Sequence, residues 1–265
     1  QIGFLYKSQT LIHIISGGHM KKNLKRREFL KKAGVAGAAA VGASTLAAPA
    51  IAGGHQEWII CSAFGKAGLL GQAIQAFGDN INRYSDKLKI KVYHSGELVP
   101  GLESLDAVRS GAAQASYGAP YYWTNVSDAI EFVATCPFGM NAMEQNAWCY
   151  YGGGIEEADK IYNALGLKFL PMGNTGNQMG GWFNKEINTP ADYQGLKMRM
   201  PGLGGRTIEK LGATPVLLAG PDVLPSLSSG AVDAAEWICP AADLGAGLYQ
   251  AAKYYYGPGW HEPST

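Results

Sequence analysis

An internal repeat constrains the fold of this 265-residue chain more than any other feature. The stretch at 105–120, LDAVRSGAAQASYGAP, returns in outline at 224–240, LPSLSSGAVDAAEWICP, with Gln114 falling on Asp233. Each copy predicts a short helix, a glycine (Gly111 or Gly230) in the left-handed stop conformation, and an apolar strand. Since such a unit cannot bury its own faces, two copies predict two similar α/β lobes with a cleft between them. The alternative is a chance match, because helix–glycine–strand is a common connection.

Residues 1–52 are predicted to lie outside these lobes. From Met20 onward come seven Lys or Arg residues and one acid, then an Ala/Gly-rich stretch at 33–48 and the cleavage-like sequence Ala50-Ile51-Ala52. This order predicts an export signal peptide over 20–52, and Arg26-Arg27 indicates the twin-arginine route. A transmembrane anchor is the poorer alternative, because the stretch is rich in Ala and Gly, is only weakly apolar and ends at the cleavage signal. Residues 1–19 are interpreted as translated upstream sequence.

The remaining 213 residues are mildly acidic. Residues 1–52 carry 8 of the 22 basic and 1 of the 21 acidic residues, which leaves 14 against 20 and a net charge of −6. These residues contain no cluster of Lys or Arg, so their sequence does not indicate a nucleic-acid-binding surface. The four cysteines are widely spaced without a CxxC pair, so the sequence selects no disulfide pairing and does not favour zinc, and buried thiols are an equal alternative.

The order of elements predicts an α/β fold with mostly parallel sheets flanked by helices. A buried strand at 57–64 is followed by a helix with its apolar stripe over 70–84, an alternating strand at 87–93, a helix at 101–109 and the strand of the first repeat copy. This β-α-β-α-β order favours ligand groups at the carboxyl ends of the strands. The later chain predicts helices at 143–150, 156–165 and 206–211, strands at 167–172, 180–184 and 196–200, and the end of a helix at 249–256.

Two charged residues stand out as candidate site residues. Arg199 follows Leu196 and Met198 near the end of a predicted strand, where its guanidinium could grip a carboxylate through two hydrogen bonds; a surface ion pair is the alternative. Glu236 lies in an apolar stretch at 231–239, and a carboxylate buried there needs a cation or must become neutral. Glu236, a backbone carbonyl and an amide such as Gln178 would form an oxygen cage for Na⁺ or Ca²⁺. The alternative is that Glu236 pairs with Arg199.

Aromatic and glycine residues give weaker signals. Tyr122 belongs to a cluster with Tyr117, Tyr121 and Trp123, and Phe64 ends the first strand, so these rings could wall a pocket, although each is more often a core residue. The segment 202–205, GLGG, weakly matches a dinucleotide-binding loop. It supports an alternative function, an exported cofactor-dependent oxidoreductase, since twin-arginine cargo often folds around a cofactor before export. His261 is interpreted as structural.

Four motifs together resemble one known family. They are GNTGNQMGGWF at 173–183, GLKMRMPGLGG at 195–205, DAAEW at 233–237 and YYYGPGWHEP at 254–263. These closely resemble the solute receptors of TRAP transporters, the DctP-type periplasmic proteins, in the branch that binds 2-oxo acids such as pyruvate or lactate-like monocarboxylates. The resemblance implies a two-lobed, type II-like periplasmic binding protein, not an enzyme. Lobe 1 is expected over 53–175, incomplete because the C-terminal part is missing, and lobe 2 over 176–265.

The resemblance also implies a role for individual residues. Arg199 would clamp the ligand carboxylate, and Tyr122 and Phe64 would line the pocket. Gln178, Glu236 and the Trp237 carbonyl would hold a Na⁺ or Ca²⁺ ion that also touches the ligand, with no organic cofactor. The implied partners are the TRAP membrane permease subunits, with Na⁺-coupled uptake, and a second copy in a homodimer. Residues 238–243 depart from the family pattern, and the small Ala241 predicts a reshaped pocket.

Overall fold

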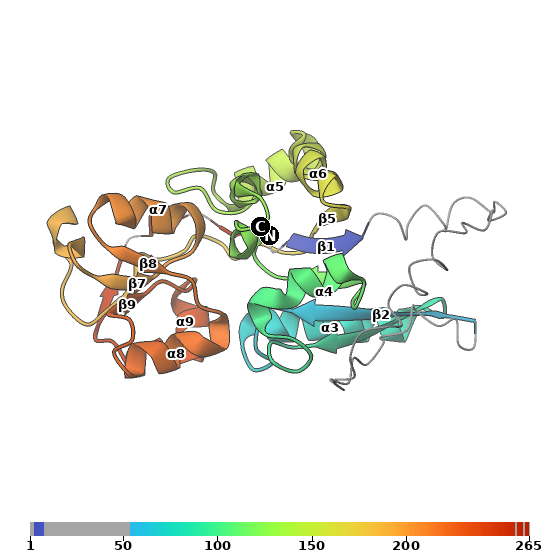
Figure 1. The fold of residues 1–265 in the computed structure, drawn as a ribbon, viewed down its shortest axis with the longest axis horizontal. Coiled ribbons are helices and arrows are strands. Elements are labelled where there is room, and N and C mark those ends of the chain that lie inside the picture. Colours follow the sequence, from blue (N-terminus) through green and yellow to red (C-terminus); the bar gives the residue numbers. More distant parts are fainter. Residues whose placement is uncertain (1–2, 8–53, 258, 262, 265) are drawn as a thin grey trace, which may run out of the picture.

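The structure is a computed structural model that describes residues 3–7, 54–257, 259–261 and 263–264. The predicted signal peptide at 20–52 lies outside the described residues. Two five-stranded sheets, each with its own helices, stand side by side (Figure 1). We call the first sheet and its helices lobe 1 and the second sheet and its helices lobe 2. Among the described residues, no helix is long and apolar enough to cross a lipid bilayer.

Lobe 1 contains the elements of the first sheet, in the order β3-β2-β4-β1-β5. Its strands are β1 (Gly3–Lys7), β2 (Gln56–Ser62), β3 (Leu88–Tyr93), β4 (Ala115–Tyr117) and β5 (Leu167–Pro171). Its α-helices are α3 (Leu69–Tyr84), α4 (Ser104–Ser110), α5 (Ala142–Tyr151) and α6 (Gly154–Ala164), with 3₁₀ helices η2 (Gly101–Glu103), η3 (Pro120–Trp123) and η4 (Asp128–Val133).

Lobe 2 contains the second sheet, in the order β10-β6-β9-β7-β8. Its strands are β6 (Gly181–Phe183), β7 (Lys197–Arg199), β8 (Thr214–Val216), β9 (Ala234–Ala235) and β10 (Tyr254–Tyr256). Its helices are α7 (Gly202–Lys210), α8 (Gly220–Ser228) and α9 (Pro240–Ala246), with 3₁₀ helices η5 (Pro190–Tyr193) and η6 (Leu248–Gln250). The predicted lobe boundary at 175 and 176 falls in the segment that joins β5 to β6.

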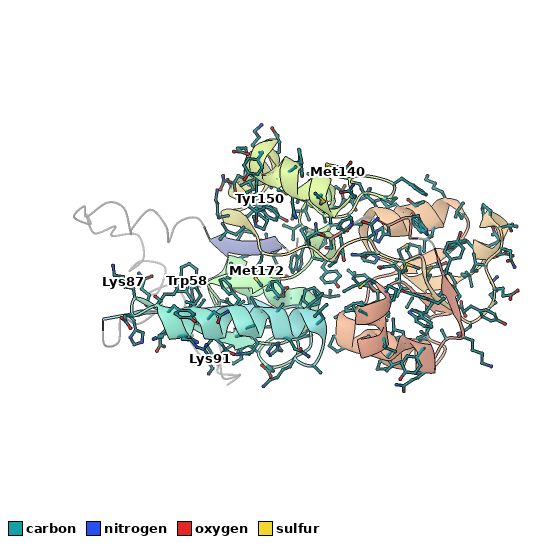
Figure 2. All side chains as sticks on the ribbon, turned by 180° about the vertical axis from the view of Figure 1, so that it is seen from behind. Trp58, Lys87, Lys91, Met140, Tyr150 and Met172 are labelled. Atoms are coloured by element: carbon teal, nitrogen blue, oxygen red, sulfur yellow. The ribbon has the colours of Figure 1, made fainter. Side chains whose placement is uncertain are left out.

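The start of lobe 1 follows from its hydrophobic pattern. Helix α3 buries Ile74 and Gly78, and the missing side chain of Gly78 lets the helix approach β3, where an added Cβ would lie 3.0 Å from Val92. Strand β3 buries Ile90 and exposes Lys91, which lies with Lys87 at the outer surface (Figure 2). Strand β2 pairs in parallel with both β3 and β4, which confirms the predicted β-α-β-α-β unit.

The internal repeat is confirmed, and its two copies make the same interstrand contacts. In each copy a left-handed glycine follows a helix, Gly111 as the cap of α4 and Gly230 two residues after the end of α8, and a short parallel strand comes next. In lobe 1 the Gln114 side chain accepts a hydrogen bond of 2.7 Å from the Ile59 amide of β2. In lobe 2 the matching Asp233 accepts one of 2.8 Å from the Lys197 amide of β7. A side-chain acceptor thus starts the pairing of two parallel strands at equivalent places in both lobes.

Each sheet also contains antiparallel strands that the sequence pattern did not predict. In lobe 1 the strand β1 pairs antiparallel with both β4 and β5. The expectation that residues 1–52 lie outside the folded body is therefore wrong for Gly3–Lys7. Its β-prone sequence GFLYK satisfies the backbone groups of two strands that would otherwise leave unpaired edges. In lobe 2, β6 pairs antiparallel with β9 and β10.

Two local predictions are corrected in lobe 2. Residues 249–256 do not end a helix, because η6 is followed by the strand β10, whose Tyr255 stacks on Trp182 of β6 at 4.3 Å between ring centroids. Residues 202–205 are not a loop but the first turn of α7. Their glycines permit close packing, since a Cβ on Gly204 would lie 2.7 Å from His261 Nε2. The oxidoreductase alternative thereby loses its sequence support.

Within the described residues, two segments of the chain join the lobes. The chain leaves lobe 1 after β5 and enters lobe 2 at β6, and the segment after β10 returns along the first connection. The Gln178 amide donates to the His261 carbonyl at 2.8 Å, and the Phe138 amide of lobe 1 donates to the Trp260 carbonyl at 3.0 Å. Two adjacent crossings of this kind are the geometry of a hinge.

Gly181→Ala should destabilise the protein strongly. Gly181 has a φ of 123°, and an added Cβ would lie 2.9 Å from the Ala235 carbonyl oxygen of the neighbouring strand. Backbone strain and the clash together should lower the free energy of unfolding by about 2–4 kcal/mol. Gly173→Ala is the matched control, because no heavy atom lies within 4 Å of its Cβ position. Urea unfolding measures both; equal effects would show that Gly181 is not constrained as described.

Candidate functional site

The centre of the site is an ion pair between the predicted residues Arg199 and Glu236. Strands β7 and β9 are parallel, with Arg199 opposite Ala235, so Glu236 follows directly beside Arg199 at the carboxyl ends of the strands. The Glu236 amide donates to the Arg199 carbonyl at 2.9 Å. Arg199 Nη1 donates to Glu236 Oε2 at 2.8 Å and to the Glu236 carbonyl at 2.5 Å. The alternative in which Glu236 pairs with Arg199 is therefore confirmed.

This pair is almost completely removed from solvent. The exposed fractions of the two side chains are 1% for Arg199 and 0% for Glu236. Burial lowers the pKa of Arg199, but the neighbouring Tyr122 and Glu236 outweigh it and hold the pKa above its ordinary value. The guanidinium therefore stays charged, and Glu236 balances it inside the protein. A buried pair of this kind is expensive to desolvate and is weak evidence for a purely stabilising role.

Arg199 has one edge that its protein partners leave open. Nη1 is occupied by Glu236, whereas Nε is buried and has no hydrogen-bond partner among the described residues. Nη2 makes a long contact of 3.3 Å to the Tyr122 hydroxyl. The Nε and Nη2 protons point in parallel from one side of the planar guanidinium, which is the geometry that grips a carboxylate bidentately.

Aromatic rings from both lobes surround this edge. Phe64 follows β2 and lies 6.1 Å from Tyr122 of η3 and 6.4 Å from Trp237, measured between ring centroids. The Trp237 ring also packs against the guanidinium, with Arg199 Cζ 5.0 Å from its centroid. Burial raises the pKa of Tyr122, so its hydroxyl stays protonated and can donate a hydrogen bond. Rings from both sides exclude water from the guanidinium.

A small cavity lies between these rings at the boundary of the lobes. Its volume is about 10 Å³, and it includes Phe64, Tyr122 and Trp237 in its lining. It adjoins a cleft of about 410 Å³ between the lobes, since Phe64, Leu70, Trp237 and Ile238 line both. The cleft wall from lobe 2 includes Ala242 and Ala246 of α9, and Lys66 is its charged lining residue. The cavity holds about one water molecule, so a larger guest requires the lobes to separate.

Two of the predicted ion-binding residues, Gln178 and Glu236, both contact His261. Gln178 is fully buried, and its Oε1 lies 3.3 Å from His261 Nδ1. The same nitrogen lies 3.8 Å from Glu236 Oε1, a buried carboxylate oxygen without a hydrogen-bond partner. The acceptor oxygens Gln178 Oε1 and Glu236 Oε1 therefore both lie within 4 Å of His261 Nδ1. Among the described residues, no group of three His, Cys, Asp or Glu side chains could hold a metal, so a site here depends on amide and carbonyl oxygens.

Sequence reasoning missed several contributors. His261, expected to be merely structural, contacts both Gln178 and Glu236 from the returning segment. Asp243, in α9, is fully buried and accepts hydrogen bonds from three separate segments. Burial raises its pKa to about 6, although the hydrogen bonds act in the opposite direction. An acid within the small-residue sequence PAADLGA was the one available signal for Asp243. The four cysteines are unpaired in the structure.

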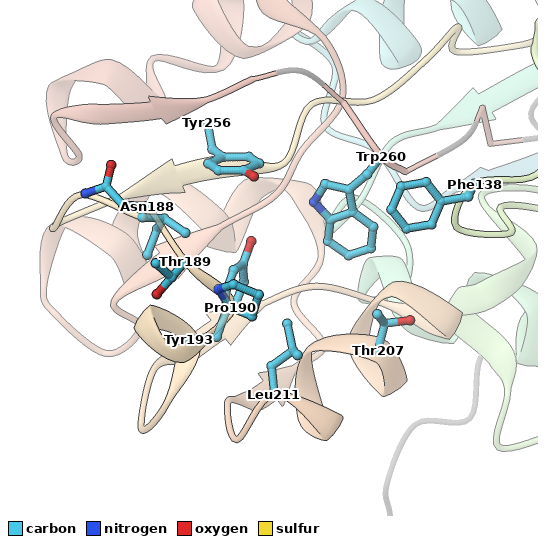
Figure 3. A pocket seen from close by; sticks show the side chains of 10 residues that line it. Phe138, Asn188, Thr189, Pro190, Tyr193, Thr207, Leu211, Tyr256 and Trp260 are labelled. Carbon is cyan, nitrogen blue, oxygen red and sulfur yellow. The ribbon is translucent and has the colours of Figure 1, made fainter.

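A second pocket, of about 230 Å³, lies in lobe 2 beside the returning segment (Figure 3). Tyr193, Leu211, Tyr256 and Trp260 contribute to its wall, and Phe138 reaches it from lobe 1. Its lining contains no charged side chain, so it offers nothing to balance a carboxylate. We therefore place the candidate site at Arg199.

Arg206→Gln should destabilise the contact between the lobes. Arg206 of α7 lies 3.0 Å from Glu131 Oε1 of η4, and Glu131 is 1% exposed. Without the guanidinium, a buried carboxylate loses its compensating charge, which should cost about 1–3 kcal/mol of unfolding free energy. Burial raises the pKa of Glu131, so the loss should be larger at pH 7 than at pH 5, where more of the carboxylate is protonated.

The matched control is Asp128→Asn. Asp128 contacts the same guanidinium nitrogen at 3.1 Å but is 79% exposed, so its loss should change stability by less than about 0.5 kcal/mol. Urea unfolding at the two pH values measures both variants. Equal losses for the two would contradict a dependence of the buried Glu131 carboxylate on Arg206.

Comparisons with known proteins show which proteins this chain resembles. A monocarboxylate 2-oxoacid-binding periplasmic protein of Nostoc sp. is 47% identical over 177 residues, which is 67% of this chain and 49% of that protein. A TRAP periplasmic solute-binding protein of Pseudoalteromonas atlantica, solved with sodium and pyruvate, is 40% identical with a TM-score of 0.75; the match covers 79% of this chain and 64% of that one. One of Colwellia psychrerythraea, solved with calcium and pyruvate, is 41% identical with a TM-score of 0.74 and the same coverage.

These matches set both the assignment and its limits. The chain spans about half the length of the curated relative and 64% of each solved structure. The family described as bacterial extracellular solute-binding protein family 7, DctP, matches residues 64–265. This match covers most of the chain and all the residues of the site described above. The chain belongs to the DctP family of bacterial extracellular solute-binding proteins.

Proposed function

We propose that this protein is a periplasmic receptor that binds a small 2-oxo monocarboxylate such as pyruvate, together with a Na⁺ or Ca²⁺ ion, for uptake by a TRAP transporter. In this proposal it has no catalytic role. One observation supports it most. The buried guanidinium of Arg199 lies between the two lobes, its Nε has no hydrogen-bond partner among the described residues, and its Nη2 makes only a long contact to the Tyr122 hydroxyl. A ligand carboxylate would bind that edge, with the Tyr122 hydroxyl beside it and Phe64 against it.

Charge balance supports the ion. Arg199 and Glu236 together are neutral, so a carboxylate that enters the site brings an uncompensated negative charge into a buried environment. Na⁺ beside Glu236 would restore neutrality, and Ca²⁺ would more than offset the charge of the ligand. The unpartnered Glu236 Oε1 fits such a cation, and Gln178 Oε1 with the Trp237 carbonyl would complete a set of hard oxygen ligands. When bound, the ion supplies positive charge that holds the ligand and the Glu236 carboxylate together.

The relatives support the ligand class and the compartment. The Nostoc relative is named for 2-oxo acids, and both solved structures contain pyruvate with sodium or calcium. We therefore propose the periplasm as the compartment, the twin-arginine signal as the export route and the TRAP permease subunits as the membrane partner. The predicted lobes at 53–175 and 176–265 would close on the ligand by bending at the double connection. The homodimer stays a prediction.

A thermal-shift screen tests the proposal. Monocarboxylates and dicarboxylates are added to the protein with Ca²⁺, with Na⁺ or with a chelator, and the melting temperature is measured. Pyruvate with an ion should raise it most, because a ligand at about 100 times its Kd stabilises the folded state by about 2.7 kcal/mol. Dicarboxylates should have less effect, since the open Nε and Nη2 edge of Arg199 can bind one carboxylate. A melting temperature that no carboxylate changes, with any ion, would overturn the proposal.

A further inference from the structure

A buried carboxylate outside the ion pair holds the backbone of the site. Asp243 lies in α9 and is fully buried. Its Oδ1 accepts a hydrogen bond of 2.9 Å from the Ile238 amide. Its Oδ2 accepts one of 3.1 Å from Trp182 Nε1 and one of 3.0 Å from the Tyr255 hydroxyl. The two oxygens therefore serve different structures, Oδ1 the segment that follows Trp237 and Oδ2 the stacked rings of β6 and β10.

The segment that Asp243 holds carries two of the proposed ion ligands. Ile238 directly follows Glu236 and Trp237, and its own carbonyl accepts from the Met179 amide at 2.8 Å. Met179 is the neighbour of Gln178. Ile238 is thus fixed on both sides, by Asp243 at its amide and by the backbone beside Gln178 at its carbonyl. The direction of the Trp237 carbonyl depends on this peptide unit, because the Trp237 C=O and the Ile238 N–H belong to one plane.

Packing alone does not account for a carboxylate at this position. A charged group without solvent is costly, and burial raises the pKa of Asp243 to about 6. An apolar residue would fill the same volume without that cost. What an apolar residue lacks is an acceptor for the Ile238 amide, which would leave a buried N–H unpaired and the peptide plane free to turn.

We propose that Asp243 is a positioning residue for the ion and carboxylate site, acting through the Ile238 amide to aim the Trp237 carbonyl and the Glu236 side chain toward Gln178. This role rests on the proposed function. The two oxygens of Asp243 then have different roles. The hydrogen bond that Oδ1 accepts determines ligand binding, and the hydrogen bonds that Oδ2 accepts contribute to stability.

Four variants test this division by calorimetric titration of pyruvate in Ca²⁺ and by hydrogen exchange of the Ile238 amide. Asp243→Ala should weaken pyruvate binding at least tenfold and speed exchange at Ile238 at least tenfold, even without ligand. Asp243→Leu keeps more of the side-chain volume and should have the same two effects. It serves as the test if the alanine variant does not fold. Asp243→Asn should stay within about threefold of wild type in affinity, because its carbonyl oxygen can still accept from Ile238.

Tyr255→Phe is the matched control. It removes one bond to Oδ2 and leaves Oδ1 unchanged, so the melting temperature should fall while affinity and exchange at Ile238 stay as in wild type. The proposal is overturned if Tyr255→Phe loses as much affinity as Asp243→Leu, or if Asp243→Leu leaves affinity and exchange unchanged. A wild-type protein that binds no pyruvate overturns the proposed function itself, whereas normal wild-type binding with an unaffected Asp243→Leu variant overturns only the role of Asp243.

Discussion

Arg199→Lys should weaken pyruvate binding by about a hundredfold while the protein stays folded. Lysine keeps the positive charge that Glu236 needs, so the buried carboxylate retains a compensating partner. It cannot replace the Nε and Nη2 edge, because an ammonium group is a point charge without a planar fork. Losing one charge-assisted hydrogen bond of about 1.5–3 kcal/mol corresponds to a factor of about 10 to 150 in Kd.

Lys197→Ala is the control for this prediction. Lys197 lies two residues earlier in β7, is exposed and takes no part in the site. Calorimetric titration of pyruvate in the presence of Ca²⁺ should give wild-type affinity for Lys197→Ala and the hundredfold loss for Arg199→Lys. An Arg199→Lys variant with wild-type affinity would mean that the carboxylate binds elsewhere.

Glu236→Gln should remove the dependence of pyruvate binding on the ion. The amide keeps the shape of Glu236 and can still accept from Arg199, but the negative charge is lost. The ligand carboxylate then balances Arg199 by itself, and a cation has no charge left to offset. Ca²⁺ should therefore change the pyruvate Kd of this variant by less than about threefold, against at least tenfold in wild type.

Glu209→Gln provides the matched removal of an acid. Glu209 is an exposed residue of α7, so this variant should keep the full effect of Ca²⁺ on pyruvate binding. Titrations with Ca²⁺ and with a chelator measure both variants. If Ca²⁺ still strengthened pyruvate binding tenfold in Glu236→Gln, Glu236 would not be an ion ligand.

Much of the fold could be predicted where the pattern is local. The stripe of α3 and the alternation of β3 depend on residues three, four or two positions apart, so they are visible in the sequence. The pairing of Arg199 with Glu236 was open to prediction as an alternative, because a carboxylate in the apolar stretch at 231–239 needs a cation or must become neutral. The repeat even aligns Gln114 with Asp233, two side chains that make equivalent interstrand hydrogen bonds.

The features that could not be predicted depend on distant partners. Strand β10 exists because Tyr255 stacks on Trp182, far away in the sequence, and three tyrosines in a row show no period of their own. The network of Asp243 joins β6, β10 and the segment after β9, and no spacing rule connects these three places. The glycines of α7 were misread because a close approach to His261 and a phosphate-binding turn require the same small residue.

The central claim is that one carboxylate binds Arg199 and a neighbouring cation at the same time, and reciprocal titration tests it most directly. The pyruvate Kd is measured with saturating Ca²⁺ and in a Na⁺-free buffer with chelator, and the Ca²⁺ Kd is measured with and without pyruvate. If both ligands share the site at Arg199 and Glu236, the two affinities should rise by the same factor, at least tenfold. Pyruvate that binds equally well with and without the ion would contradict the claim.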